Sequence, residues 1–164
     1  MHQKREMILN CRNDVINGKK ILEPIISELF NINNEFLLDL SDAANHITRH
    51  FHGSKVDIEE LANIKKNFCS EDCTFCSQSA FFNTKITGYE LPPPEEIVEQ
   101  ALNAKNDGAG SFCLVAAWRE PSTLDFKKVC IIIEEINKKV GISVECSLGF
   151  LTDKQAKTLK KLQE

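Results

Sequence analysis

The sequence predicts an α/β protein in which N-terminal helices precede the first three βα units of a truncated (β/α)8, TIM-type barrel. The N-terminal third shows only helical periodicity, whereas the rest alternates short apolar runs with helical patterns of about 12 to 16 residues. A closed barrel of this type needs eight units and roughly 250 residues, so the sequence ends mid-pattern. We therefore expect a helical segment at residues 1–54, an incomplete barrel domain at residues 55–164, and a longer parent protein.

The N-terminal segment is predicted to contain helices separated by Gly18 and Pro24. Apolar residues between Asn13 and Phe30 recur at three- and four-residue intervals, the spacing of an amphipathic helix. Pro24 fits the first turn of a second helix, because the N–H that proline lacks makes no helical bond there. A further helix is expected from about Asn34 to Phe51, with Gly53 ending it.

The remaining sequence is predicted to form three strands, each followed by a helix. Residues 56–66 fit neither a helical nor a strand pattern cleanly, and we assign a strand because a cysteine loop and a regular βα series follow. The nearly all-apolar run Ser111–Ala117 predicts a strand that is buried on both faces. The other expected elements are a helix beginning near Leu91-Pro92-Pro93-Pro94, a helix at about Leu124–Lys139, a strand at Ile142–Leu148, and a helix from Thr152 capped by Thr152 or Asp153.

The composition is that of a globular protein. The 164 residues are 42% hydrophobic and 27% charged, and the net charge of -4 gives no reason to expect nucleic acid or an anionic membrane as a partner. No stretch approaches the roughly 20 apolar residues of a membrane helix, and none fits a signal peptide. The seven cysteines include three in one loop, so a reducing cytoplasm fits them better than a disulfide framework.

Cys69, Cys73 and Cys76 form the strongest candidate site, with the spacing Cys-x3-Cys-x2-Cys. Thiolates this close can reach one metal centre from a single loop. A structural zinc site requires four protein ligands, and the candidates for the fourth are His46, His50 and His52. Three cysteines on a 4Fe–4S cluster would instead leave one iron free for a substrate or cofactor. The position of the loop before a βα series favours the iron–sulfur interpretation.

The cysteine motif, with an aromatic residue before its last cysteine, resembles the signature of radical S-adenosylmethionine (SAM) enzymes. The wider match resembles the biotin synthase family and covers most of the chain from about Ile16 onward. The segments that carry it are Cys69–Ser79, Phe112–Arg119, Leu148-Gly149 with the helix after it, and the helical lead-in Leu37–Gly53.

This resemblance implies that Cys69, Cys73 and Cys76 hold a 4Fe–4S cluster whose fourth iron chelates SAM. Cleavage of SAM would give a 5′-deoxyadenosyl radical, used to insert sulfur into dethiobiotin and form biotin. Phe75 would lie near the adenine, and the backbone of Ala116 and Ala117 near the methionyl part of the cofactor. The family also implies an electron donor such as flavodoxin or ferredoxin, a homodimer at full length, and a cytoplasmic location.

Cys113 and Cys146 are candidates for a second metal group. The residue pattern alone favours Cys113 as a small apolar residue of a buried strand. The resemblance instead implies a ligand of an auxiliary 2Fe–2S or other iron–sulfur cluster, thought to donate the sulfur. Glu145 occupies the position of the family's next cluster cysteine, and Cys146 comes one residue later. Since neighbours in a strand point to opposite faces, a bulge, a different binding mode or no cluster all stay open.

Two other functions remain as alternatives. One is another radical SAM enzyme of the same subgroup, acting in methylation, rearrangement or cofactor assembly, and the other is a non-catalytic zinc- or cluster-binding module. We also expect residues 1–164 expressed alone to be inactive and prone to aggregate, because the apolar strands would lack most of their barrel.

Overall fold

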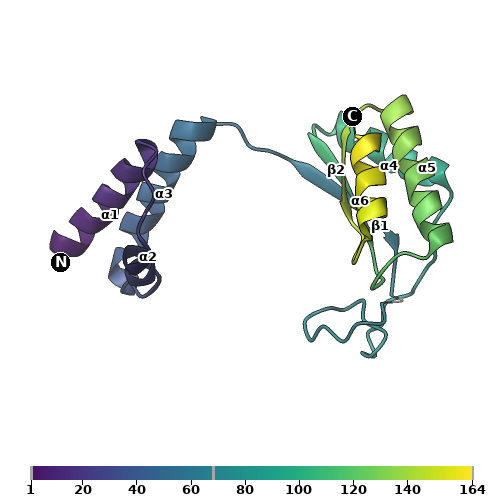
Figure 1. Cartoon of the computed structure of the whole chain (residues 1–164), viewed down its shortest axis with the longest axis horizontal. Helices are drawn as coiled ribbons and strands as arrows, with labels where there is room; N and C mark the ends of the chain where they lie inside the picture. The colour runs from purple at the N-terminus through teal and green to yellow at the C-terminus, as the bar shows by residue number, and fades with distance from the viewer. Residues whose placement is uncertain (1, 68, 164) are drawn as a thin grey trace. The chain divides into compact units, whose positions relative to one another are not determined.

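The computed structural model describes residues 2–67 and 69–163 of the chain. These form two compact units, Met1–Val56 and Asp57–Glu164, the first made of helices and the second of a sheet with helices (Figure 1). Within the described residues, no helix combines the length and the apolar character that a membrane span requires.

The first unit is built from α1 and α3, which pack side by side, together with the shorter α2 and a 3-10 turn. Its elements are α1 (His2–Ile16), α2 (Glu23–Phe30), η1 (Asn34–Phe36) and α3 (Leu37–His52). A small core of Ile8, Phe36 and Ala43 joins them. The helices expected after Pro24 and from about Asn34 are present, and Pro24 lies in the first turn of α2. The helix expected from Asn13 instead ends at Ile16. The sequence pattern missed most of α1, because only Ile8 and Cys11 of this polar helix are buried.

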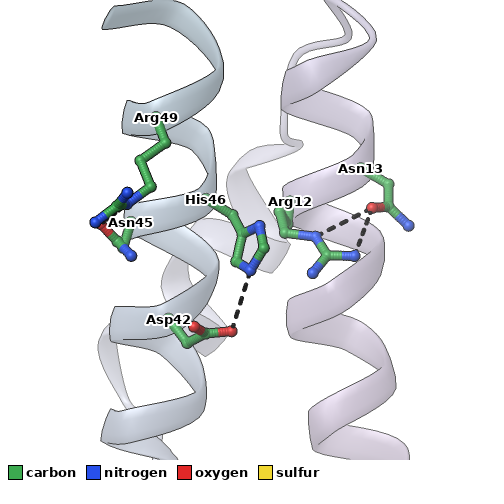
Figure 2. Close-up of polar contacts among 6 residues, drawn as sticks. All are labelled: Arg12, Asn13, Asp42, Asn45, His46 and Arg49. Atoms are coloured by element: carbon green, nitrogen blue, oxygen red, sulfur yellow. Dashed lines mark hydrogen bonds and ion pairs between the residues drawn. The ribbon is translucent and has the colours of Figure 1, made fainter. Parts of the chain in front are cut away.

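Polar contacts also lie within α1 and within α3 (Figure 2), and a hydrogen bond joins the two helices. Between the helices, Arg5 Nε donates to Asp39 Oδ2 at 3.0 Å. Within α3, His46 Nε2 lies 3.8 Å from Asp42 Oδ2, one helical turn away, as Figure 2 shows. His46 therefore has a carboxylate neighbour on its own helix.

The second unit contains three parallel strands in the order β1–β2–β3, as the sequence predicts. The elements are β1 (Glu59–Lys65), α4 (Pro94–Asn106), β2 (Ser111–Ala116), α5 (Thr123–Lys139), β3 (Ser143–Ser147) and α6 (Asp153–Leu162). Thr152 caps α6 in a reciprocal capping box with Gln155, which confirms the predicted start of this helix. The register of β1 on β2 shifts between Asn63 and Lys65, whereas β2 and β3 pair without a shift.

The core lies between the sheet and the helices, on one face of the sheet. Along β2, buried and half-buried residues alternate: Phe112, Leu114 and Ala116 are buried, and Ser111, Cys113 and Val115 are half-buried. We call the side of the sheet with the buried residues the helix-covered face, and the side with the half-buried residues the open face. The prediction that β2 is buried on both faces is therefore wrong for this chain, because α4, α5 and α6 pack on the helix-covered face alone.

Candidate metal centre

The clustered cysteines lie in the loop that joins β1 to α4. This loop follows the C-terminal end of β1, and Ala116 and Ala117 stand at the C-terminal end of β2. The two ends are joined, because the backbone N–H of Ala117 donates to the carbonyl of Lys65 at 2.8 Å. The C-terminal edge of a parallel sheet is where barrel enzymes place their sites. The structure thus brings the cysteine loop and Ala116–Ala117 to the same edge.

Backbone hydrogen bonds close the cysteine loop on itself. The Cys69 N–H donates to the carbonyl of Gln78 at 3.4 Å, and the Ala80 N–H donates to the carbonyl of Cys69 at 2.9 Å. Inside the loop, the Cys76 N–H donates to the carbonyl of Cys73 at 2.9 Å, which makes a tight turn. These bonds fix the backbone at all three cysteines.

The side chain of Gln78 ties this loop to the sheet. Its Nε2 donates to Asn63 Oδ1 at 3.0 Å, and its Oε1 accepts from the Asn67 N–H at 3.2 Å. Asn67 has φ of 60°, a left-handed conformation that asparagine tolerates better than most residues. Its Nδ2 donates to the Ile86 carbonyl at 2.8 Å. Gln78 and Asn67 therefore position both ends of the loop.

Ser79 and Arg119 hold the other side of the loop. The Ser79 side chain is 1% exposed, and its Oγ donates to the carbonyl of Glu71 at 2.5 Å. The Glu71 carboxylate accepts from Arg119 Nη1 at 3.1 Å, which links the cysteine loop to the segment after β2. The guanidinium of Arg119 also stands 5.4 Å from the ring centroid of Phe150, so it contacts the segment after β3.

The three thiols are not gathered around one point. Cys73 is exposed, Cys69 and Cys76 are half-buried, and the neighbouring Phe75 is 92% exposed. Among residues 2–67 and 69–163, no group of three or more His, Cys, Asp or Glu side chains is arranged to hold a metal ion. Three thiols without a fourth ligand fit an iron–sulfur cluster better than structural zinc.

Cys113 and Cys146 lie on opposite faces of the sheet. Cys113 is on the open face, where burial, the Glu59 side chain and the charge of Glu145 raise its pKa to about 11. Cys146 packs against the core on the helix-covered face, and this burial raises its pKa to about 12. Because β2 and β3 pair without a bulge, Glu145 is the register partner of Cys113. In this arrangement Cys146 does not stand beside Cys113, and its role as a ligand of an auxiliary cluster stays a prediction.

Comparison with known families decides the class of this chain. Residues 63–163 match the family model described as the radical SAM superfamily. The chain belongs to this superfamily. It is 62% identical over 158 residues to the biotin synthase of Nitrosopumilus maritimus (strain SCM1), covering 96% of this chain and 48% of that protein. It is 52% identical over 155 residues to the biotin synthase of Cenarchaeum symbiosum (strain A), covering 94% of this chain and 48% of that protein.

Bacterial proteins and a solved structure are also similar. The biotin synthase of Lysinibacillus sphaericus (strain C3-41) is 36% identical over 153 residues, covering 93% of this chain and 46% of that protein. The chain thus spans about half the length of the curated relatives it matches. The crystal structure of a methylornithine synthase superposes with a TM-score of 0.78 at 20% identity, covering 92% of this chain and 44% of that chain, which supports the fold alone.

Not all of the predicted site residues are brought together by the structure. The cysteine loop and Ala116–Ala117 share one edge, but the N–H of Ala117 and the carbonyl of Ala116 already bond within the protein. Their contact with the methionyl part of SAM stays a prediction, as does that of Phe75 with the adenine. Sequence reasoning missed the roles of Gln78 and Asn63, although Gln78 follows the last clustered cysteine by two residues.

Proposed function

We propose that the protein containing this chain is a radical SAM sulfurtransferase that inserts sulfur into dethiobiotin to form biotin. The observation that carries this proposal is the 62% identity to a protein named biotin synthase over 96% of the chain. The chain's own arrangement is consistent with it, because three thiols stand in the loop that follows the first strand of a parallel sheet.

In this function Cys69, Cys73 and Cys76 would hold a 4Fe–4S cluster, with SAM on the iron they leave free. The cluster and SAM, when bound, supply the 5′-deoxyadenosyl radical that acts on the substrate. The protein's part is to position the reactants and exclude water. Gln78 holds the loop to the sheet, and Ser79 bonds within the loop. Phe75 would meet the adenine, and Ala116 and Ala117 would border the methionyl part.

The remaining assignments belong to the same proposal. Residues 55–164 would be the incomplete barrel domain and residues 1–54 a helical segment before it. A small electron-transfer protein such as flavodoxin or ferredoxin would reduce the cluster. The full-length protein would be a cytoplasmic homodimer, with an auxiliary iron–sulfur cluster near Cys113.

The 164 residues alone would be inactive and prone to aggregate. Leu61 on the open face is 58% exposed, and the half-buried Val115 stands on the same face of the adjacent strand. Exposed apolar side chains on an uncovered sheet face, and an unpaired strand edge, normally require a covering layer. A soluble monomer that unfolds cooperatively at this length would contradict this part of the proposal.

The test is product analysis of the full-length protein after anaerobic reconstitution with iron and sulfide. With dethiobiotin, a reductant and SAM, the wild type should form biotin and 5′-deoxyadenosine, and Cys76→Ser should form neither. Deoxyadenosine without biotin would indicate a different radical SAM reaction. Zinc without iron or sulfide after reconstitution would indicate a non-catalytic module.

A further inference from the structure

The open face of the sheet presents the Cys113 thiol between carboxylates of both neighbouring strands, Glu59 of β1 and Glu145 of β3. Cys113 of β2 pairs directly with Glu145 of β3, and the pairing runs unbroken from Ser111 with Ser143 to Val115 with Ser147. Directly paired residues of neighbouring strands project to the same face. Glu145 is exposed and Cys113 is half-buried, so both side chains remain accessible from the open face.

β3 offers no thiol to this face. Cys146 lies between two residues of the open face and packs among the core residues under the helices. Moving its thiol to the open face would require a register slip of one residue, which would also bring the buried Val144 out of the core. The core on the helix-covered face therefore holds Cys146 where it is.

These residues do not fit an auxiliary cluster that takes one thiolate from β2 and another from β3. They fit a mixed set, since carboxylate oxygens are established ligands of iron in proteins. We propose that the auxiliary iron–sulfur cluster of this protein is bound by Cys113 without a thiolate from β3, and that Glu145 supplies a carboxylate ligand in its place. This inference rests on the proposed function, which includes the auxiliary cluster.

The test compares variants of the full-length protein, reconstituted anaerobically with iron and sulfide. Iron and sulfide are counted per polypeptide, and Mössbauer spectra separate the auxiliary cluster from the cluster of the cysteine loop. Cys113→Ser should abolish the auxiliary cluster. Glu145→Gln should change the spectrum of the auxiliary cluster and weaken cluster binding. Loss of an outer-shell partner lowers metal affinity about 10- to 100-fold, and loss of a direct ligand should lower it at least as much. Glu145→Cys should retain the auxiliary cluster with a changed spectrum.

Two controls match these variants in chemistry. Cys146→Ser removes a nearby thiol on the other face, and Glu60→Gln removes an exposed carboxylate of β1 that has no register pairing with Cys113. Both should leave the iron count and the spectrum unchanged. Loss of the auxiliary cluster in Cys146→Ser, an unchanged spectrum in Glu145→Gln, or a wild type with only one cluster would each overturn the proposal.

Failure of the inference can be told apart from failure of the proposed function. The first is read from the auxiliary cluster's iron count and spectrum. The second is read from SAM-dependent formation of 5′-deoxyadenosine and biotin, which depends on the cluster of Cys69, Cys73 and Cys76. If the protein makes biotin and Glu145→Gln leaves the spectrum of the auxiliary cluster unchanged, the inference is refuted and the proposed function is not.

Discussion

Gln78 Nε2 donates to Asn63 Oδ1 at 3.0 Å, so a residue of the cysteine loop, two positions after its last cysteine, is bonded to the strand that precedes the loop. The same side chain accepts from the N–H of Asn67, and its backbone carbonyl accepts from the N–H of Cys69. Gln78 therefore joins the C-terminal part of β1 to the first clustered cysteine.

We expect Gln78→Ala to weaken cluster binding more than it weakens the fold. Each lost side-chain hydrogen bond costs about 0.5–1.5 kcal/mol in stability, whereas partners of metal ligands affect metal affinity by about 10- to 100-fold. Iron retained after reconstitution and the cluster's EPR spectrum with and without SAM measure the effect. Gln163→Ala is the matched control, because Gln163 Nε2 donates to the Val144 carbonyl, away from the loop. Equal iron loss in both variants would show a general loss of stability.

Gly149→Ala should strongly destabilise the protein. A Cβ at Gly149 would lie 2.2 Å from the carbonyl oxygen of Arg119, and the glycine has φ of +67°. The left-handed conformation alone costs a non-glycine residue about 1–2 kcal/mol, and the clash is with backbone that cannot rotate away. Gly141→Ala is the control, because it has φ of +64° but meets only Lys105 Nζ at 3.8 Å. Chemical denaturation should show a larger loss for Gly149→Ala, and equal losses would exclude the clash.

The buried thiol of Cys146 should make stability depend on alkaline pH. Burial raises its pKa from the ordinary 9.0 to about 12, so the folded state holds the proton more tightly than the unfolded state. This contribution to stability is full below about pH 9 and is lost as the pH rises towards 12. The denaturation midpoint of the metal-free protein should fall over that range. Cys146→Ala should show a shallower fall, and an identical pH profile would refute the assignment.

Arg119→Ala should change global stability little. Its ion pair with Glu71 is exposed, with 56% and 36% of the two side chains accessible, and such pairs contribute about 0–1 kcal/mol. The effect should instead appear locally, as faster amide hydrogen exchange at Glu71 to Cys76, since this contact joins the loop to the segment after β2. Exchange in that loop equal to the wild type would show that the ion pair does not order it.

Local patterns in the sequence were sufficient for most of the fold. The apolar runs, the prolines at helix starts and the cap at Thr152 predicted three strands and the helices between them, because these signals act within a few residues. They failed for α1, a polar helix whose Ile8 is buried by contact with other helices of its unit. They also overestimated the burial of β2, since the covering of a sheet face depends on elements elsewhere in the chain.

By itself the sequence determined the class of site, because three thiols within eight residues can serve one metal centre whatever the surrounding fold. Only the tertiary structure decided which residues surround that loop and which side chain β3 presents to Cys113. Strand register sets the face on which a side chain lies, and register is fixed by the packing of Val144 and its neighbours under the helices. For that reason Cys146 is partly buried against the core and Glu145 is the register partner of Cys113.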